Sequence, residues 1–311
     1  GLISLTQAQH ETRIEEIKVT VRPYSSQSID HIAQPVSILK GDELWEKVSN
    51  TLGETLGQEL GVSASDFGQG SSRPVIRGLA GPRVRILLNG LGSMDVSTIS
   101  VDHAVTLEPV NAEQIEVLRG PSTLLFGSGA SGGLVNISNN RIHEQLPEPF
   151  SATINASYNS VANAKMLGVS SDAAIKNIGF HFDVLTRMTD NYNARTGEIL
   201  NSSVETDDVN AGVSFINNQK GFLGAAYGRY ETVYEIPFNP DDPDELVFID
   251  QAQDRIDIAG RINTPMKGLK SVSLRLGNVD YGHTEFEGLN DPGTVFHNDE
   301  WEGHLELQHQ P

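Results

Sequence analysis

Apolar and polar residues alternate one by one through much of the chain after Phe150. In 150–158, FSATINASY, the apolar or small residues at even positions alternate with polar residues at odd positions, which is typical of a strand with two different faces. The alternation recurs in 180–188, 208–215, 255–262, 272–278 and 301–307. The pattern predicts about eight strands, without a C-terminal strand that would close a barrel.

Two architectures satisfy such alternation. A soluble sandwich turns its polar faces outward, whereas a transmembrane barrel turns apolar side chains to lipid and polar side chains to a wet lumen. Here the polar faces carry full charges, and short connections such as KNIG alternate with long ones such as 190–203. Aromatic residues fall near the predicted strand ends, where barrels carry aromatic girdles: Phe150, Tyr158, Tyr234, Tyr281 and Trp301. These features favour the barrel.

The first 145 residues mix helix and strand patterns. Leucine and valine recur every four residues in 40–56, which predicts short helices, while 84–92, 112–120 and 130–138 read as strands, the first running into an Asn-Gly turn. The segment 116–137, EVLRGPSTLLFGSGASGGLVNI, interleaves apolar residues with glycines. Because glycine adopts positive φ and permits close backbone approach, we expect a buried, tightly turning segment.

Composition narrows the class of protein. The 311 residues are 38% hydrophobic and 20% charged, as in a folded protein, and the net charge of -19 argues against a nucleic-acid partner. That acidity suits either a cation ligand or an ordinary solvated surface. The absence of cysteine excludes disulfides and thiolate metal sites. The opening GLISLTQAQ is compatible with the tail of a cleaved secretory signal or with an ordinary terminus.

Two motifs carry a resemblance to a known family. RPVIRGLAGPRVRILLNGLG (73–92) and VNAEQIEVLRGPSTLLFGSGASGGLVNI (110–137) resemble the plug domain of TonB-dependent outer-membrane receptors. The resemblance implies an α+β plug domain followed by antiparallel transmembrane strands, an incomplete part of a roughly 22-stranded barrel with a plugged lumen. It divides the chain into an N-terminal segment (1–30), the plug (31–145) and the first part of the barrel (146–311), so the chain is expected to be a fragment.

The resemblance also assigns candidate residues. The segment 15–21, EEIKVTV, looks like the TonB box, a short strand that would pair with TonB, with a plain first strand of the plug as the alternative. Its predicted contact residues are Glu16, Ile17, Lys18, Val19, Thr20 and Val21. Arg77 and Arg119, in the two Arg-Gly motifs, are expected to meet wall carboxylates and lock the plug in place.

The candidate ligand residues are Asp102 and His103, since an adjacent carboxylate and imidazole suit a divalent metal. The chain looks most like the zinc-uptake receptors within the family, although its loop 234–248 has no histidine. That loop instead offers oxygen ligands, which either capture cations or form a solvated acidic surface: Asp241, Asp242, Asp244 and Glu245. Four late histidines are interpreted as scattered wall residues: His283, His297, His304 and His309.

No phosphate loop or nucleophile elbow is complete, so we expect no enzyme and no resident cofactor. The resemblance implies a monomeric receptor in the Gram-negative outer membrane, with its plug and N-terminus accessible from the periplasm. Its expected partners are TonB, membrane lipid and a scarce nutrient, either zinc, another metal or a metal chelate. A siderophore or heme receptor is the alternative within transport, and a soluble periplasmic β-rich binding protein is the alternative of another class.

Overall fold

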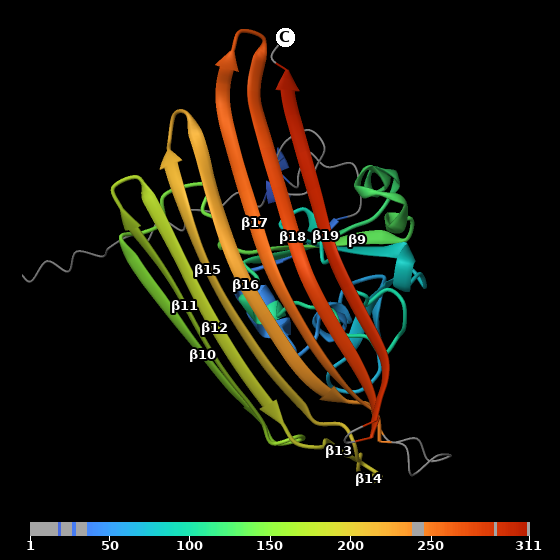
Figure 1. The fold of residues 1–311 in the computed structure, drawn as a ribbon. Helices are drawn as coiled ribbons and strands as arrows, with labels where there is room; N and C mark the ends of the chain where they lie inside the picture. The colour runs from blue at the N-terminus through green and yellow to red at the C-terminus, as the bar shows by residue number, and fades with distance from the viewer. Residues whose placement is uncertain (1–17, 20–26, 29–35, 238–245, 289–290, 310–311) are drawn as a thin grey trace, which may run out of the picture.

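The computed structural model describes residues 18–19, 27–28, 36–237, 246–288 and 291–309. A mixed domain lies within 36–138, and we call it the plug. A sheet of eight antiparallel strands lies within 150–309, and we call it the wall; the plug lies against one face of it (Figure 1). This arrangement confirms the predicted fold class. Within the described ranges, no helix has the length and apolar character needed to cross a membrane.

The plug is built on a five-stranded sheet in the order β3-β8-β9-β6-β7, in which only β6 and β9 run parallel. Its strands are β3 (Val36–Lys40), β6 (Val84–Leu88), β7 (Leu91–Gly92), β8 (Gln114–Leu118) and β9 (Gly133–Ser138). Apolar side chains from these strands form one buried cluster, including Leu39, Ile86, Ile115, Val135 and Ile137. The Asn-Gly turn predicted after β6 is confirmed, because Asn89 and Gly90 have φ of 51° and 85°.

The four-residue stripe of 40–56 forms two short helices, α1 (Asp42–Lys47) and α2 (Leu52–Leu56). Thr51 begins α2 by accepting a hydrogen bond from the amide of Glu54. Gly53 faces the hairpin of β4 (Val62–Asp66) and β5 (Ser72–Ile76), and a Cβ there would lie 2.2 Å from Ser72 Oγ. Glycine is therefore needed in α2 for close packing.

The glycine-rich segment forms two 3-10 helices, η4 (Pro121–Phe126) and η5 (Ser128–Ala130), between β8 and β9. Two similar turns, η2 (Gly81–Arg83) and η3 (Pro109–Asn111), lie earlier in the plug. Gly127 has φ of 105°, and a Cβ on Gly132 would lie 2.7 Å from Leu79 Cβ. The prediction of tight turning and close backbone approach is thus confirmed.

The wall is a meander in which each strand pairs with the next long strand of the chain. Its strands are β10 (Phe150–Asn159), β11 (Ala164–Ile175), β12 (Ile178–Thr189), β15 (Val204–Asn217), β16 (Gly221–Glu235), β17 (Phe248–Met266), β18 (Leu269–Gly288) and β19 (Asp291–His309). Between β12 and β15 lies a small hairpin of β13 (Asn193–Ala194) and β14 (Gly197–Glu198); β1 (Lys18–Val19) pairs with β2 (Gln27–Ser28) near the N-terminus. The short turns after β11, β15 and β17 share one end of the sheet, the end at which β10 begins.

The two faces of the wall have opposite polarity. On β12, Phe180 and Phe182 are 40% and 45% exposed, while the neighbours His181 and Asp183 are buried at 8% and 2%. On β15, Val209, Val213 and Phe215 are likewise exposed. Apolar side chains therefore point away from the plug and polar ones toward it, which confirms the arrangement expected of barrel strands.

The outward apolar face ends at a row of charges. Arg229 on β16 pairs outward with Glu231 and with Asp254 of the next strand, at 2.5 and 2.7 Å. On β15, Val209 lies opposite Arg229 in the register, and Asp207 lies opposite Glu231. This row marks the edge of the continuous apolar band, because the exposed residues beyond it mix charges such as Glu205 and Asp250 with apolar residues such as Val233.

Two of the predicted girdle aromatics are wrong. Tyr234 and Tyr281 are completely buried and point toward the plug, whereas Phe150, Tyr158 and Trp301 are exposed as expected. The hydroxyl group of Tyr234 accepts a hydrogen bond from the amide of Ala104 in the plug, and the hydroxyl group of Tyr281 donates to Gln251. A ring that faced lipid would lack such partners.

Candidate metal-binding site between plug and wall

A buried ion pair joins the plug to the wall. Both terminal nitrogens of Arg187, on β12, donate to the carboxylate of Glu108 in the plug, and the Nη1 bond is 3.1 Å long. Nη1 also donates to the carbonyl of Asn50. Burial raises the pKa of Glu108, and the charge of Arg187 opposes that shift. Because both side chains are at most 4% exposed, each compensates the other's loss of water.

Other contacts spread along the same interface. Arg85 of the plug pairs with Glu302 of β19 at 2.6 Å, and Glu302 also accepts from the amide of Gly92. Arg255 of β17 donates to the carbonyl of Gly92 at 2.9 Å, and Arg275 of β18 donates to that of Asn89 at 2.7 Å. The plug is therefore held by wall arginines on plug carbonyls as well as by ion pairs.

The two arginines predicted to lock the plug make other contacts among the described residues. Arg119 donates within the plug, to Ser37 Oγ and the carbonyl of Leu60, and Arg77 is exposed with a φ of 52°. Burial, and then the nearby charge of Arg77, lower the pKa of Arg119. Among the described residues neither pairs with a wall carboxylate; Arg187 and Arg85 form ion pairs between plug and wall, and Arg141, in the segment after the plug, pairs with Asp183 and Asp208 of the wall.

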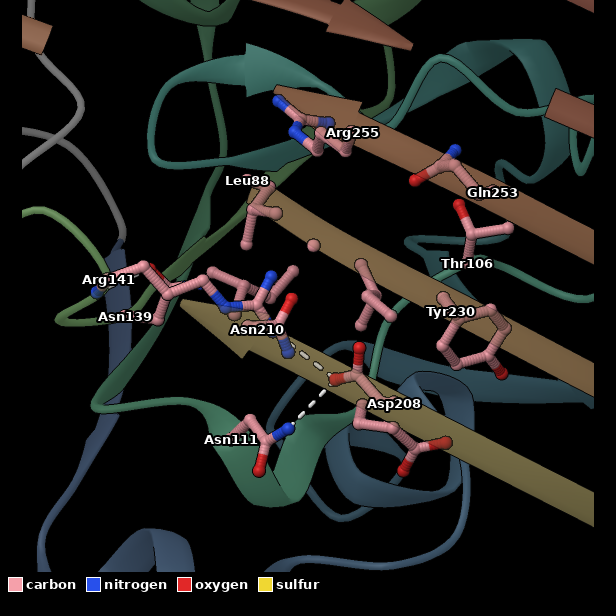
Figure 2. Close-up of a pocket in the computed structure, with 14 residues that line it drawn as sticks. Leu88, Thr106, Asn111, Asn139, Arg141, Asp208, Asn210, Tyr230, Gln253 and Arg255 are labelled. Carbon is pink, nitrogen blue, oxygen red and sulfur yellow. Dashed lines mark hydrogen bonds and ion pairs between the residues drawn. The ribbon is translucent and has the colours of Figure 1, made fainter. Parts of the chain in front are cut away.

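Asp208 lies at the centre of a polar network in this interface (Figure 2). Its Oδ2 accepts from Asn111 of η3 at 2.9 Å and from Arg141 at 3.2 Å. The cavity beside it has a volume of about 30 Å³, room for a water molecule or two. The contact between plug and wall is thus polar and closely packed at this point.

Tyr234 fixes the plug segment that carries the predicted ligands. Its hydroxyl accepts from the amide of Ala104 at 3.0 Å and donates to the carbonyl of Asp102 at 2.9 Å. These two bonds clamp the backbone on both sides of His103. The imidazole of His103 is buried at 1% exposure and points to β18.

Three possible metal ligands meet there: His103 of the plug, and His283 and Glu285 of β18, whose ligand atoms all lie within 4.8 Å of one another. Nε2 of His103 is 2.9 Å from Oε1 of Glu285, and Nε2 of His283 is 3.6 Å from the same oxygen. The two imidazole centroids are 4.5 Å apart. Phe296 of β19 packs edge-on against both rings, which shields one side of the group.

The outer partners orient both imidazoles. Nδ1 of His103 donates to the carbonyl of Val96 at 3.1 Å, which leaves Nε2 as the ligand atom. Tyr281 donates to Gln251 at 3.2 Å and therefore accepts from Nδ1 of His283 at 2.9 Å. Nε2 of His283, which has no hydrogen-bond partner among the described atoms, is likewise free to bind. Two neutral imidazoles, each oriented by an outer hydrogen-bond partner, and a carboxylate are ligands typical of zinc and similar metals.

The structure divides the predicted Asp102–His103 pair. The carboxylate of Asp102 accepts from the hydroxyl of Ser100, two residues earlier, and is not one of the three converging groups. His103 instead finds its partners 180 residues later in the chain, on β18. The prediction thus named one residue of the group and missed two.

The remaining candidates fall elsewhere. Lys18 and Val19 form β1, while Glu16, Ile17, Thr20 and Val21 lie outside the described residues, as do Asp241, Asp242, Asp244 and Glu245. Of the late histidines, His283 joins the site, which corrects its reading as a scattered wall residue, whereas His297, His304 and His309 are exposed. The pattern His283-Thr284-Glu285 was the missed signal, because residues two apart on a strand share a face.

Comparisons with known proteins agree with the fold. Residues 28–134 match the family model of the TonB-dependent Receptor Plug Domain. The Rhizobactin receptor of Rhizobium meliloti (strain 1021) is 31% identical over 134 residues, 42% of this chain and 17% of that protein. The Hemin receptor of Yersinia enterocolitica is 25% identical over 135 residues, 43% of this chain and 19% of that protein.

Among solved structures, the Copper transporter OprC superimposes with a TM-score of 0.68 at 17% identity, over 82% of this chain and 38% of that one. The chain thus aligns with about a fifth of the length of these curated relatives and less than half of this solved structure. These findings confirm the resemblance to TonB-dependent receptors. They give no support to the zinc-uptake subgroup in particular.

Proposed function

Since residues 28–134 match the family model of the plug of TonB-dependent receptors, we propose that this chain is the plug and part of the wall of an outer-membrane importer of a divalent transition-metal ion, with zinc as the first candidate. The observation that carries the proposal is the convergence of His103, His283 and Glu285. The chain's net charge of -19 favours attraction of a cation to the protein.

The position of the three residues suggests how binding would act on the plug. His103 belongs to the plug, while His283 and Glu285 belong to the wall, beyond the charged row that ends the apolar band. A metal ion here would pull the clamped segment 102–104 toward β18. The outer membrane has neither ATP nor an ion gradient, so release would need mechanical work by TonB on the N-terminal segment, where 15–21 stays the predicted contact.

An organic chelate is the second candidate substrate, because relatives are named as rhizobactin and hemin receptors. The burial of the group argues for a bare ion at this site. His103 and His283 are each 1% exposed, and Glu285, at 23% for its side chain, is the member that solvent reaches. A chelate large enough to enclose the metal would have to bind elsewhere on the outer surface.

The test is calorimetric titration of the purified protein in detergent, first with Zn²⁺ and then with a ferric siderophore and with heme. We expect Zn²⁺ binding that weakens at least 10- to 100-fold in His103→Ala and in His283→Ala, the range seen when even an outer partner of a metal ligand is lost. Binding should also weaken as the pH falls, because protonated imidazole cannot ligate. His297→Ala, whose side chain is 66% exposed, is the matched control.

Asp102→Ala separates the sequence prediction from the observed geometry. Because Asp102 bonds to Ser100 rather than to the ligand group, we expect only a small change in Zn²⁺ affinity. Zinc affinity unchanged by both His103→Ala and His283→Ala would overturn the metal proposal. Recovery of the intact protein in the soluble periplasmic fraction would overturn the membrane location.

A further inference from the structure

A second group of imidazoles and carboxylates lies at the other end of the contact between plug and wall. His143 belongs to the linking segment (residues 139–149), which joins the plug to β10, while Asp172 and His181 lie on β11 and β12. Asp172 and His181 are directly opposite each other in the strand register, three residue pairs from the short turn. This turn is at the end of the sheet where the chain leaves the plug, far along the strands from His283 and Glu285.

Both imidazoles aim at one oxygen. Nε2 of His143 is 3.0 Å and Nδ1 of His181 is 2.7 Å from Oδ1 of Asp172, and the ligand atoms of all three residues lie within 4.8 Å of one another. The rings are inclined by 70° with centroids 6.0 Å apart, so they approach the oxygen from different directions. Two imidazole nitrogens and a carboxylate oxygen are three of the four ligands of a tetrahedral site, with the fourth left for water.

The hydrogen-bond partners of His181 are compatible with a bound metal. Its second nitrogen, Nε2, lies 2.9 Å from Oδ2 of Asp183, so both of its nitrogens face carboxylate oxygens. A neutral imidazole has one N–H and satisfies only one of them, whereas an imidazolium donates to both. With a metal on Nδ1, Nε2–H donates to Asp183 in the carboxylate–histidine–metal arrangement.

Asp183 is itself held in place for this role. Its Oδ1 accepts from Asn111 of the plug at 2.9 Å and from Asn210 of β15 at 2.8 Å. Arg141 approaches its Oδ2 at 3.5 Å. The carboxylate that orients His181 is therefore fixed from the plug, the wall and the linking segment.

An open cavity adjoins this group at His143. His143 lines an open cavity of about 460 Å³, whose other lining residues include Glu144 and Asp257. The side chain of Asp172 is 22% exposed, whereas the two imidazoles are buried at 8%. The group is thus largely enclosed by protein, and His143 is its member that lines this cavity.

The linking segment lies directly on the wall beside the group. A Cβ on Gly212 would lie 1.7 Å from the carbonyl oxygen of Arg141, and one on Gly179 would lie 3.2 Å from Cδ2 of His143. One on Gly224 would lie 2.5 Å from Cγ2 of Ile142. The linking segment therefore packs directly on the glycines of the wall strands. An ion bound by all three ligands would join this segment to β11 and β12.

The geometry points to a second divalent transition-metal site, made by His143, Asp172 and His181, which fastens the linking segment to the wall. Imidazole and carboxylate ligands suit Zn²⁺ and Co²⁺. The site has no residue in common with the His103 group, and the inference does not depend on the proposed function.

The experiment counts metal equivalents. The purified protein in detergent, stripped of metal with a chelator, is titrated with Zn²⁺, and Co²⁺ absorption then reports the coordination geometry. We expect two equivalents for the unaltered protein, one for His143→Ala, one for His103→Ala and none for the double variant. Asp172→Asn, which keeps the side-chain volume, should also bind one equivalent, and His297→Ala should bind two.

The outcomes separate the two sites. If His143→Ala and Asp172→Asn bind as many equivalents as the unaltered protein, the second site is refuted while the His103 site stands. If the unaltered protein binds a single Zn²⁺ equivalent, which is lost in His143→Ala and kept in His103→Ala, the second site is upheld. The proposed function then loses the observation on which it rests. If His143→Ala does not fold, Asp172→Asn alone decides.

Discussion

The plug and the wall bury opposite kinds of side chain. The plug encloses an apolar cluster around Ile115 and Ile137, as a soluble domain does. The wall buries Asp183, Arg187 and Asn210 on its inner face and leaves valine and phenylalanine exposed on its outer face. The difference teaches that the plug has a core of its own, whereas the wall depends on its surroundings, since its polar inner face finds partners on the plug and its exposed apolar outer face suits lipid.

The largest expected effect comes from breaking the ion pair that joins the two parts. Arg187→Ala leaves Glu108 buried and unpaired, which should cost about 3–5 kcal/mol in the free energy of unfolding. Denaturant titration in detergent measures it, together with protease protection of the plug. The double variant Glu108→Gln/Arg187→Met removes both charges and should recover most of the loss. A change below about 1 kcal/mol in Arg187→Ala would show that the pair does not hold the plug.

A charge on the outer face should have the next largest effect. Val213→Lys, on β15 within the apolar band, is expected to destabilise the protein in lipid by about 2–4 kcal/mol. Glu231→Lys, within the charged row, should change the stability little, although it exchanges an ion pair for repulsion from Arg229. Refolding into lipid vesicles measures both. Equal effects of the two substitutions would contradict the assigned edge of the band.

The smallest effect compares the same chemical change in the two regions. Ile115→Val removes one methylene from the plug core and should cost about 0.5–1.5 kcal/mol. Ile256→Val, at a position 47% exposed on β17, removes the same group from a surface that meets lipid and should cost close to nothing. Thermal unfolding of the two variants side by side gives the comparison. A larger loss for Ile256→Val would mean that its side chain packs against protein.

Much of the fold was predictable because its signals are local. Alternation with a period of two marks the wall strands, and the Asn89-Gly90 dipeptide marks its turn through its own backbone preferences. The short turn at 176–177 also sets the pairing of Asp172 with His181, so two of the three residues of the second proposed metal group were available from counting outward from that turn. The inward direction of Tyr234 was not available, because an aromatic residue near a strand end suits either face.

The sequence by itself determined which stretches are strands, which face of each is apolar and which segment turns on glycine, because neighbouring residues decide these properties. Only the tertiary structure decided which side chains meet. His103 finds His283 and Glu285, Arg187 finds Glu108, and His143 finds Asp172 and His181. The physical reason is that these contacts depend on how the plug is seated against the wall, and that seating is the sum of many weak contacts between residues distant in the chain.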